Sequence, residues 1–324
     1  MRRTLTSYAV AACAVALCAL AACKSDSGTN PPATTGDKTH GEYLVKNVAV
    51  CGDCHTQRGM TGLPIDSLTM AGGVAFSIPS LGTVYSRNLT SDSTHGIGAW
   101  TDQQIITAIR TGIAPMHMHN GVAMDSVLFP VMPYWLYGYL TDSDVKDIVA
   151  YLRTLKAVSY DPPMDTIPAV ARVTWPKQAG IPDATTNDAT TQRGKYLVTI
   201  AACIDCHTIP AATATNPLAP GINTSLFLAG GRPFETIEPG RLIMSKNITP
   251  DVATGIGSWT SSQIDSAFAF GWDDEHRALC PPMPWQAFNG MTSTDRAAIV
   301  AYLRGIPAVN NAVPEDTTLH CPHP

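Results

Sequence analysis

A series of short motifs occurs twice, in the same order, along this chain of 324 residues. The first copy begins at Gly41 and the second at Gly194, each with the pattern Gly-x-Tyr-Leu-Val. The motifs that follow in both copies are Cys-x-x-Cys-His, Ala-Gly-Gly, Asn-x-Thr-x-Asp, Gly-Ile-Gly-x-Trp-Thr, Met-Pro-aromatic and Ala-Tyr-Leu-Arg. An ordered repeat of this length indicates a duplicated domain. We therefore predict two domains, over residues 41–156 and 192–308, with a proline-rich linker at 157–191 and a tail at 309–324.

The elements predicted within each copy are mostly helices. Short apolar helices over 41–50 and 194–202 lead into the first cysteine of each Cys-x-x-Cys-His motif. The patterns Thr-x-x-Gln at Thr101 and Thr260 are capping boxes, each opening a helix. The last helix of each copy is expected to begin after Thr141 and Thr292. The fold class is therefore predicted as mainly α, with long loops at 59–84 and 208–241.

The first residues form a predicted export signal rather than part of the fold. Residues 1–22 combine two arginines with a short apolar run of small residues. The run ends in Leu-Ala-Ala-Cys, which resembles a bacterial lipobox and implies lipid on Cys23; the alternative is an ordinary signal peptide. Residues 23–40 are predicted as a flexible tether. The expected location is the periplasm or cell envelope, anchored in a membrane, with the outer membrane slightly favoured because Lys24 and not Asp follows Cys23.

The charge of the exported chain is moderately negative. The whole chain has 21 basic and 26 acidic residues, and loss of Arg2 and Arg3 with the signal changes the formal charge from −5 to −7. An acidic surface argues against nucleic acid as a partner.

The nine cysteines are accounted for in groups. Two lie in the signal segment, one is the lipid candidate, and four belong to the two Cys-x-x-Cys-His motifs. The remaining pair, Cys280 and Cys321, is predicted to form a disulfide, since disulfides persist in exported proteins. The alternative is two free thiols.

The pattern Cys-x-x-Cys-His is the attachment site of a c-type haem. Two such motifs predict two haem c groups, bound through thioethers to Cys51 and Cys54 and to Cys203 and Cys206. The adjacent His55 and His207 are the expected proximal iron ligands. A redox dithiol or half of a zinc site is the rival interpretation, and the following histidine, the export signal and the second copy count against both.

A methionine bound at the sixth coordination position of the haem iron leaves that position unavailable to other ligands and raises the reduction potential of the haem. Met132 and Met283 are the expected distal ligands, because they follow His55 and His207 by 77 and 76 residues. The segment Met116–Asn120 holds other candidates, Met116, His117, Met118 and His119, and Met124 lies nearby. We expect a surface loop there; copper binding, an exchange of iron ligand and contact with a partner are the alternatives.

The motif set over residues 41–307 resembles that of the class I c-type cytochromes. It is most similar to dihaem cytochromes that serve as electron-transfer subunits of bacterial periplasmic or membrane-bound dehydrogenases. The resemblance implies that Gly41 packs against Tyr151 and Gly194 against Tyr302, where the first and last helices cross. It also implies that six residues surround the haem edges: Arg87, Asn88, Trp100, Lys246, Asn247 and Trp259. Arg87 and Lys246 are expected either to pair with haem propionates or to lie in solvated loops.

The predicted function is electron transfer, through two haems with His and Met ligands, from a dehydrogenase-type donor to a respiratory or extracellular acceptor. On this view the chain has no substrate of its own and is not an enzyme. The alternative is a dihaem enzyme, of the peroxidase or thiosulfate-oxidising type, in which one iron is open or differently ligated.

Overall fold

The computed structural model describes residues 35–59, 63–119, 122–124, 126–211, 221–235 and 241–314. The predicted signal peptide, Cys23 and Cys321 lie outside these ranges, and so does most of the predicted tether. Among the described residues, no helix has the length and apolar character needed to cross a membrane.

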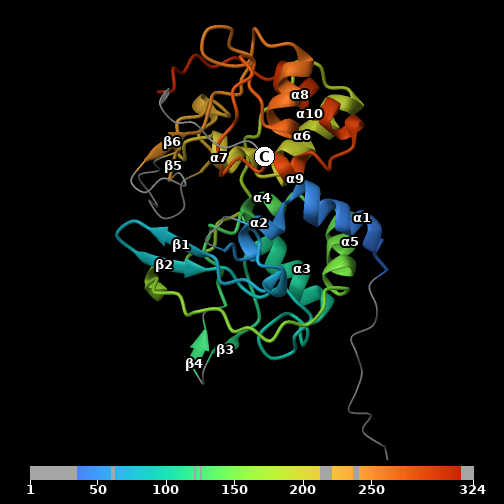
Figure 1. Ribbon diagram of the computed structural model, residues 1–324, viewed down its shortest axis with the longest axis vertical. Coiled ribbons are helices and arrows are strands. Elements are labelled where there is room, and N and C mark those ends of the chain that lie inside the picture. Colours follow the sequence, from blue (N-terminus) through green and yellow to red (C-terminus); the bar gives the residue numbers. More distant parts are fainter. Residues whose placement is uncertain are drawn as a thin grey trace, which may run out of the picture. The chain divides into compact units, whose positions relative to one another are not determined.

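The first repeat is built mainly from short helices, which Figure 1 labels in chain order. Its elements are α1 (Lys38–Tyr43), a π-helical turn η1 (Leu44–Val48), α2 (Cys51–His55), a 3-10 turn η2 (Asp66–Leu68), β1 (Ala75–Ile78), β2 (Gly82–Tyr85), α3 (Asp102–Thr111), β3 (His117–His119), β4 (Val122–Met124), α4 (Tyr134–Tyr137) and α5 (Asp142–Leu152).

The second repeat returns to nearly the same order of elements. After a 3-10 turn η3 (Ala169–Ala171) come α6 (Ala189–Ile200), α7 (Cys203–His207), a 3-10 turn η4 (Thr224–Leu226), β5 (Pro233–Glu235), β6 (Leu242–Met244), α8 (Ser261–Phe270), α9 (Trp285–Phe288) and α10 (Ser293–Gly305). Within the described residues, β3, β4 and the π-helical turn η1 have no separate counterpart in the second repeat. The mainly α class is confirmed.

Helix starts follow the capping signals of the sequence. Both predicted capping boxes are present, at Thr101 before α3 and at Thr260 before α8. Thr141 and Thr292 cap α5 and α10. The first helix of each repeat begins earlier than expected, because Asp37 and Asp188 accept hydrogen bonds from the free backbone N–H groups of α1 and α6.

The first and last helices of each repeat cross at a glycine, so the predicted packing of Gly41 and Gly194 is confirmed. Helix α1 packs on α5 and α6 on α10 (Figure 1). A Cβ atom on Gly41 would lie 1.8 Å from the Asp147 carbonyl oxygen and 3.0 Å from Tyr151 Cβ. On Gly194 it would lie 2.0 Å from the Ala298 carbonyl oxygen and 2.7 Å from Tyr302 Cβ. Only a residue without a side chain permits this approach.

Replacement of Gly41 by alanine is therefore expected to destabilise the protein. Alanine favours an isolated helix by about 1 kcal/mol over glycine, but overpacking against a backbone carbonyl costs about 3 kcal/mol. Denaturant unfolding of the holoprotein measures the net loss. Gly59→Ala is the matched control, since among the described residues its Cβ would meet nothing closer than the Leu63 carbonyl at 3.9 Å. An equal midpoint for the two variants would contradict this account of the crossing.

A π-helical turn absorbs a difference in length between the repeats. Cys51 follows Gly41 by ten positions, whereas Cys203 follows Gly194 by nine. The extra residue widens one turn of the first helix into η1, where the Ala49 N–H donates to the Leu44 carbonyl. The cysteine motif consequently follows its helix in the same way in both repeats.

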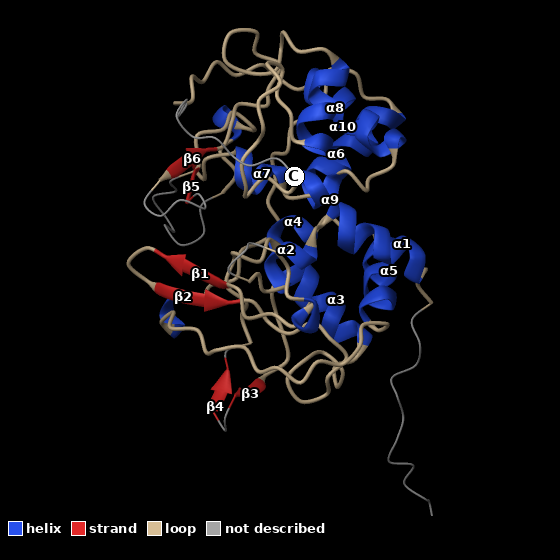
Figure 2. Ribbon diagram, in the orientation of Figure 1, coloured by secondary structure: helices blue, strands red, loops and turns tan. Residues whose placement is uncertain are grey.

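The two predicted long loops are not wholly irregular, which corrects the expectation for 59–84 and 208–241. The first contains a 3-10 turn, β1 and most of β2, and the second contains a 3-10 turn and β5; β1–β2 and β5–β6 are two-stranded antiparallel hairpins (Figure 2). Their strands have only three or four residues, so the alternating pattern that identifies a strand is too short to stand out among glycines and prolines.

The linker packs on the first repeat and does not extend freely. Ile167 and Ala171 of the linker form a small apolar cluster with Val84 of β2. The main apolar cluster contains residues of both repeats, including Leu44 and Leu197 of the first helices and Val149 and Ile299 of the last. Burial of one shared apolar surface favours a fixed arrangement of the repeats.

Candidate functional site

The two Cys-x-x-Cys-His motifs form the short helices α2 and α7. The residue before each, Val50 or Ala202, has left-handed backbone, with φ of 42° and 56°. A non-glycine residue there costs on the order of 1–3 kcal/mol and marks a segment that the surroundings hold in place. The strain recurs at both motifs, so the chain enters both cysteine helices through the same turn.

None of the four motif cysteines forms a disulfide. Burial raises the pKa of the Cys51 and Cys203 thiols to about 12. A redox dithiol needs the opposite shift, since its attacking thiol is activated by a lowered pKa. The raised pKa values of these thiols therefore do not fit an activated redox dithiol.

Each motif histidine is oriented by a backbone carbonyl from a distant loop. His55 Nδ1 donates to the Arg87 carbonyl oxygen at 2.6 Å, and His207 Nδ1 donates to the Lys246 carbonyl oxygen at 2.7 Å. A carbonyl only accepts, so Nδ1 carries the ring proton. Burial lowers the pKa of both imidazoles. The neutral ring then presents the Nε2 lone pair, which is the arrangement of a metal-binding histidine.

Glycines bring these carbonyls to the histidines. The Gly72 N–H donates to the His55 carbonyl, and the Gly230 N–H donates to the His207 carbonyl, both at 2.8 Å. A Cβ on Gly72 would lie 2.6 Å from the Arg87 carbonyl oxygen, and a Cβ on Gly230 equally far from the Lys246 oxygen. The repeated Ala-Gly-Gly motif is the sequence signal of this role, which the pattern alone did not reveal.

Asn88 and Asn247 form hydrogen bonds with the segment that follows each repeat. The Asn88 amide nitrogen donates to the Val158 and Tyr160 carbonyls, and its oxygen accepts from Thr90. The Asn247 amide nitrogen likewise donates to the Val309 carbonyl, and its oxygen accepts from Thr249. Their amides are thus engaged by the chain itself, so each asparagine holds the loop that carries the orienting carbonyl.

Arg87 has a carboxylate partner within the chain. Its guanidinium lies 3.0 Å from Asp165 of the linker, a carboxylate whose side chain is 3% exposed. Arg172 pairs with the same carboxylate at 2.6 Å. Arg87 is therefore not the free cation of a solvated loop. For Lys246, the structure shows the role of the backbone carbonyl, which accepts the hydrogen bond from His207.

Trp100 and Trp259 are partly buried against the main apolar cluster. Their carbonyls accept hydrogen bonds from Arg153 and Arg304, the last residues of the two Ala-Tyr-Leu-Arg motifs. These contacts tie each Gly-Ile-Gly-x-Trp-Thr loop to the last helix of its own repeat. A role of the indoles at a haem edge stays a prediction.

Met132 and Met283 occupy equivalent positions, two residues before α4 and α9. Both are partly buried and pack against the apolar cluster that also receives Cys51 and Cys203. The Tyr134 N–H donates to the Met132 carbonyl at 2.8 Å, which turns the chain into α4. The two methionines and the two cysteine motifs thus border the same cluster, and ligation of iron by the methionines stays a prediction.

The two cysteine helices lie near one another. Tyr137 of α4 is 5% exposed and donates to the Ala49 carbonyl at 3.2 Å, just before α2. Burial raises its pKa well above the ordinary value, and smaller contributions come from Cys51, Cys54 and Asp205. Since Asp205 belongs to α7, both helices are within electrostatic reach of one buried tyrosine.

The donor set fits a covalently attached haem. Each motif offers two unpaired thiols and a neutral imidazole whose Nε2 is available, held by strained and hydrogen-bonded backbone. Cys280 is disulfide-bonded, while its predicted partner Cys321 lies outside the described residues, so that pairing stays a prediction. The side chains of His117, Met118, His119 and Met124 also lie outside the described part of the chain.

Comparison with known proteins gives a consistent picture. A family model described as cytochrome c matches residues 40–156. The fructose dehydrogenase cytochrome subunit of Gluconobacter japonicus is 34% identical, over 83% of this chain and 52% of that protein. The gluconate 2-dehydrogenase cytochrome c subunit of Pantoea cypripedii is 29% identical, over 83% of this chain and 59% of its own length. A diheme cytochrome c-type protein of Cereibacter sphaeroides is 27% identical, over 85% of this chain and 88% of that protein. The chain thus spans just over half the length of the two dehydrogenase subunits.

Proposed function

Because the chain belongs to the cytochrome c family, we propose that it carries two haem c groups and passes electrons from a dehydrogenase to a second acceptor. The observation that carries the proposal is the pair of equivalent histidines, each with Nδ1 bound to a carbonyl and Nε2 available for iron. In this proposal the repeats are two tandem cytochrome c domains, and the chain resides in the cell envelope with lipid on Cys23.

The haems would supply one-electron redox chemistry, and the chain would decide how each iron is held. The thiols of Cys51 and Cys54, and of Cys203 and Cys206, would form the thioether bonds. The Arg87 and Lys246 carbonyls keep each imidazole in one tautomer and one orientation. Met132 and Met283 would close the sixth positions, which favours electron transfer over binding of oxygen or peroxide.

A dehydrogenase as donor is supported by the names of the relatives, which are cytochrome subunits of fructose and gluconate dehydrogenases. The negative formal charge of the chain suits a donor or acceptor with a basic docking face.

Carbon monoxide tests the proposed carrier. The purified holoprotein, fully reduced, is expected to show no rapid change of its haem spectrum on addition of carbon monoxide, because neither iron has an open position. Hydrogen peroxide with a reduced dye should give no turnover above that of free haem. Rapid binding of carbon monoxide to either haem, or peroxide turnover, would contradict the carrier and favour the dihaem enzyme.

A further inference from the structure

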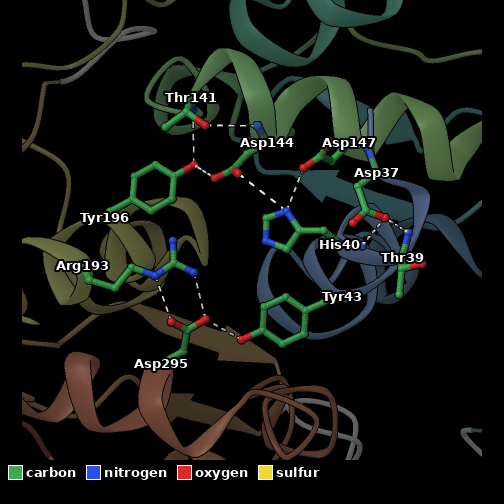
Figure 3. A network of polar contacts seen from close by, with 10 residues as sticks. All are labelled: Asp37, Thr39, His40, Tyr43, Thr141, Asp144, Asp147, Arg193, Tyr196 and Asp295. Atoms are coloured by element: carbon green, nitrogen blue, oxygen red, sulfur yellow. Dashed lines mark hydrogen bonds and ion pairs between the residues drawn. The ribbon is translucent and has the colours of Figure 1, made fainter. Parts of the chain in front are cut away.

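The two repeats meet through a reciprocal pair of tyrosine–aspartate hydrogen bonds (Figure 3). Tyr43 of α1 donates to Asp295 Oδ2 of α10 at 2.6 Å. Tyr196 of α6 donates in the same way to Asp144 Oδ2 of α5. Each hydroxyl oxygen also accepts a backbone N–H, from Thr292 for Tyr43 and from Thr141 for Tyr196, both at 3.3 Å.

These contacts relate equivalent positions of the repeats. Tyr43 and Tyr196 are the tyrosines of the two Gly-x-Tyr-Leu-Val motifs, and the aspartates are the third residues after the N-caps Thr141 and Thr292. Each tyrosine therefore binds the start of the other repeat's last helix. A contact in which residue i meets residue j and j meets i is that of an isologous, two-fold interface. The same arrangement would join two identical subunits.

Further polar groups complete the contacts, and they differ between the repeats. Arg193 donates to both carboxylate oxygens of Asp295 at 2.9 Å. Its counterpart in the first repeat is His40, whose Nδ1 lies 2.8 Å from Asp147 and 3.8 Å from Asp144. Burial acts to raise the pKa of Asp295, but hydrogen bonds from Arg193 and Tyr43 hold it below the ordinary value. Asp295 is consequently ionised and paired near neutral pH.

We call Tyr43, Asp295, Tyr196 and Asp144 the clamp, and its two tyrosines lie close in sequence to the cysteine helices. Tyr43 precedes Cys51 by eight residues, and Tyr196 precedes Cys203 by seven. Between the clamp tyrosines and the cysteine helices, two equivalent contacts join the repeats: α9 packs on η1, and α4 packs on α6. The Asn47 amide, in η1, also donates to the Ala287 carbonyl of α9 at 2.9 Å. The clamp tyrosines and these packings therefore belong to the same segments that lead into α2 and α7.

We propose that the clamp residues are positioning residues, which hold the two cysteine helices at one separation and thereby set the rate of electron exchange between the two haems. This inference rests on the proposed function, because it requires a haem on each motif. The clamp carries no electrons in this proposal. Exchange between haems weakens steeply with distance, so a small shift of one repeat against the other changes the rate more than it changes either haem.

The clamp also predicts a dependence of stability on alkaline pH. Burial, and then the Asp295 carboxylate, raise the pKa of Tyr43 to about 12. A pKa raised on folding stabilises the folded state fully below the unfolded value, about 10, and this contribution is lost as the pH rises through 12. The free energy of unfolding should fall over that range in the wild type, and less steeply in Tyr43→Phe. Parallel curves for the two proteins would contradict a buried, protonated Tyr43.

The double variant Tyr43→Phe/Tyr196→Phe tests the clamp in the holoprotein. We expect both haems to remain, each with its wild-type spectrum, while the rate at which an electron supplied by flash reduction redistributes between them falls about tenfold. Each single variant should show part of the effect. Tyr85→Phe is the matched control, since the Tyr85 hydroxyl donates no hydrogen bond within the described residues, and its rate should equal that of the wild type.

The outcomes separate this inference from the proposed function. Two haems with an unchanged exchange rate in the double variant would overturn the clamp and leave the proposed function intact. A wild-type protein with fewer than two haems would overturn the proposed function itself. If the double variant loses haem, the single variants decide, because an unchanged rate in both also overturns the clamp.

Discussion

Replacement of Cys51 and Cys54 by serine is expected to halve the haem that stays bound under denaturing conditions, from two groups per chain to one. The thioether bonds need both thiols, and within the described residues only the four motif cysteines are free. The remaining haem should be the one attached to Cys203 and Cys206. Haem content is measured from the alkaline pyridine spectrum of the denatured protein, relative to protein concentration.

The reciprocal variant, Cys203→Ser/Cys206→Ser, is the matched control and should lose the other haem to the same extent. The variant with all four substitutions should retain none. A wild-type content of one haem, or a variant at one motif that still retains two, would contradict attachment at both motifs. Because the repeats share one apolar cluster, each pair should also lower the stability of the neighbouring repeat.

Replacement of Met132 or of Met283 by alanine is expected to leave the sixth coordination position of one haem iron without its methionine ligand. The sulfur-to-iron charge-transfer band of the oxidised protein should lose half its intensity in either single variant. The potential of the affected haem should fall by more than about 0.1 V, within the range of about 0.8 V that axial ligands span. Carbon monoxide should then bind to that haem after reduction, since its sixth position is vacant.

Two conservative variants serve as controls for this loss. Met291→Leu changes a buried methionine, 3% exposed, whose counterpart in the first repeat is Leu140. Met116→Leu changes an exposed methionine, 73% exposed, in the segment that holds the other candidate ligands. Both should retain the full band and both potentials. Loss of the band in Met116→Leu with retention in Met132→Ala would assign the ligand of the first haem to the other segment.

The elements that sequence reasoning predicted are those with a local physical signal. The capping boxes at Thr101 and Thr260 satisfy backbone donors three residues away, so the signal and its effect lie in one turn. The hairpins were missed because each strand is too short for a pattern. The early starts of α1 and α6 were missed because Asp37 and Asp188 lie in segments predicted as tether and linker.

The sequence alone predicted where haem would be attached, since Cys-x-x-Cys-His places two thiols and an imidazole on one short segment. The resemblance of the motifs to those of class I c-type cytochromes also implied which glycines admit the crossing of the first and last helices. Only the tertiary structure decided how the histidines are held and how the repeats join. The carbonyls of Arg87 and Lys246 lie 32 and 39 residues from their histidines, and Tyr43 lies 252 residues from Asp295. Such partners depend on which loops and helices meet in space, and no local pattern of residues encodes that.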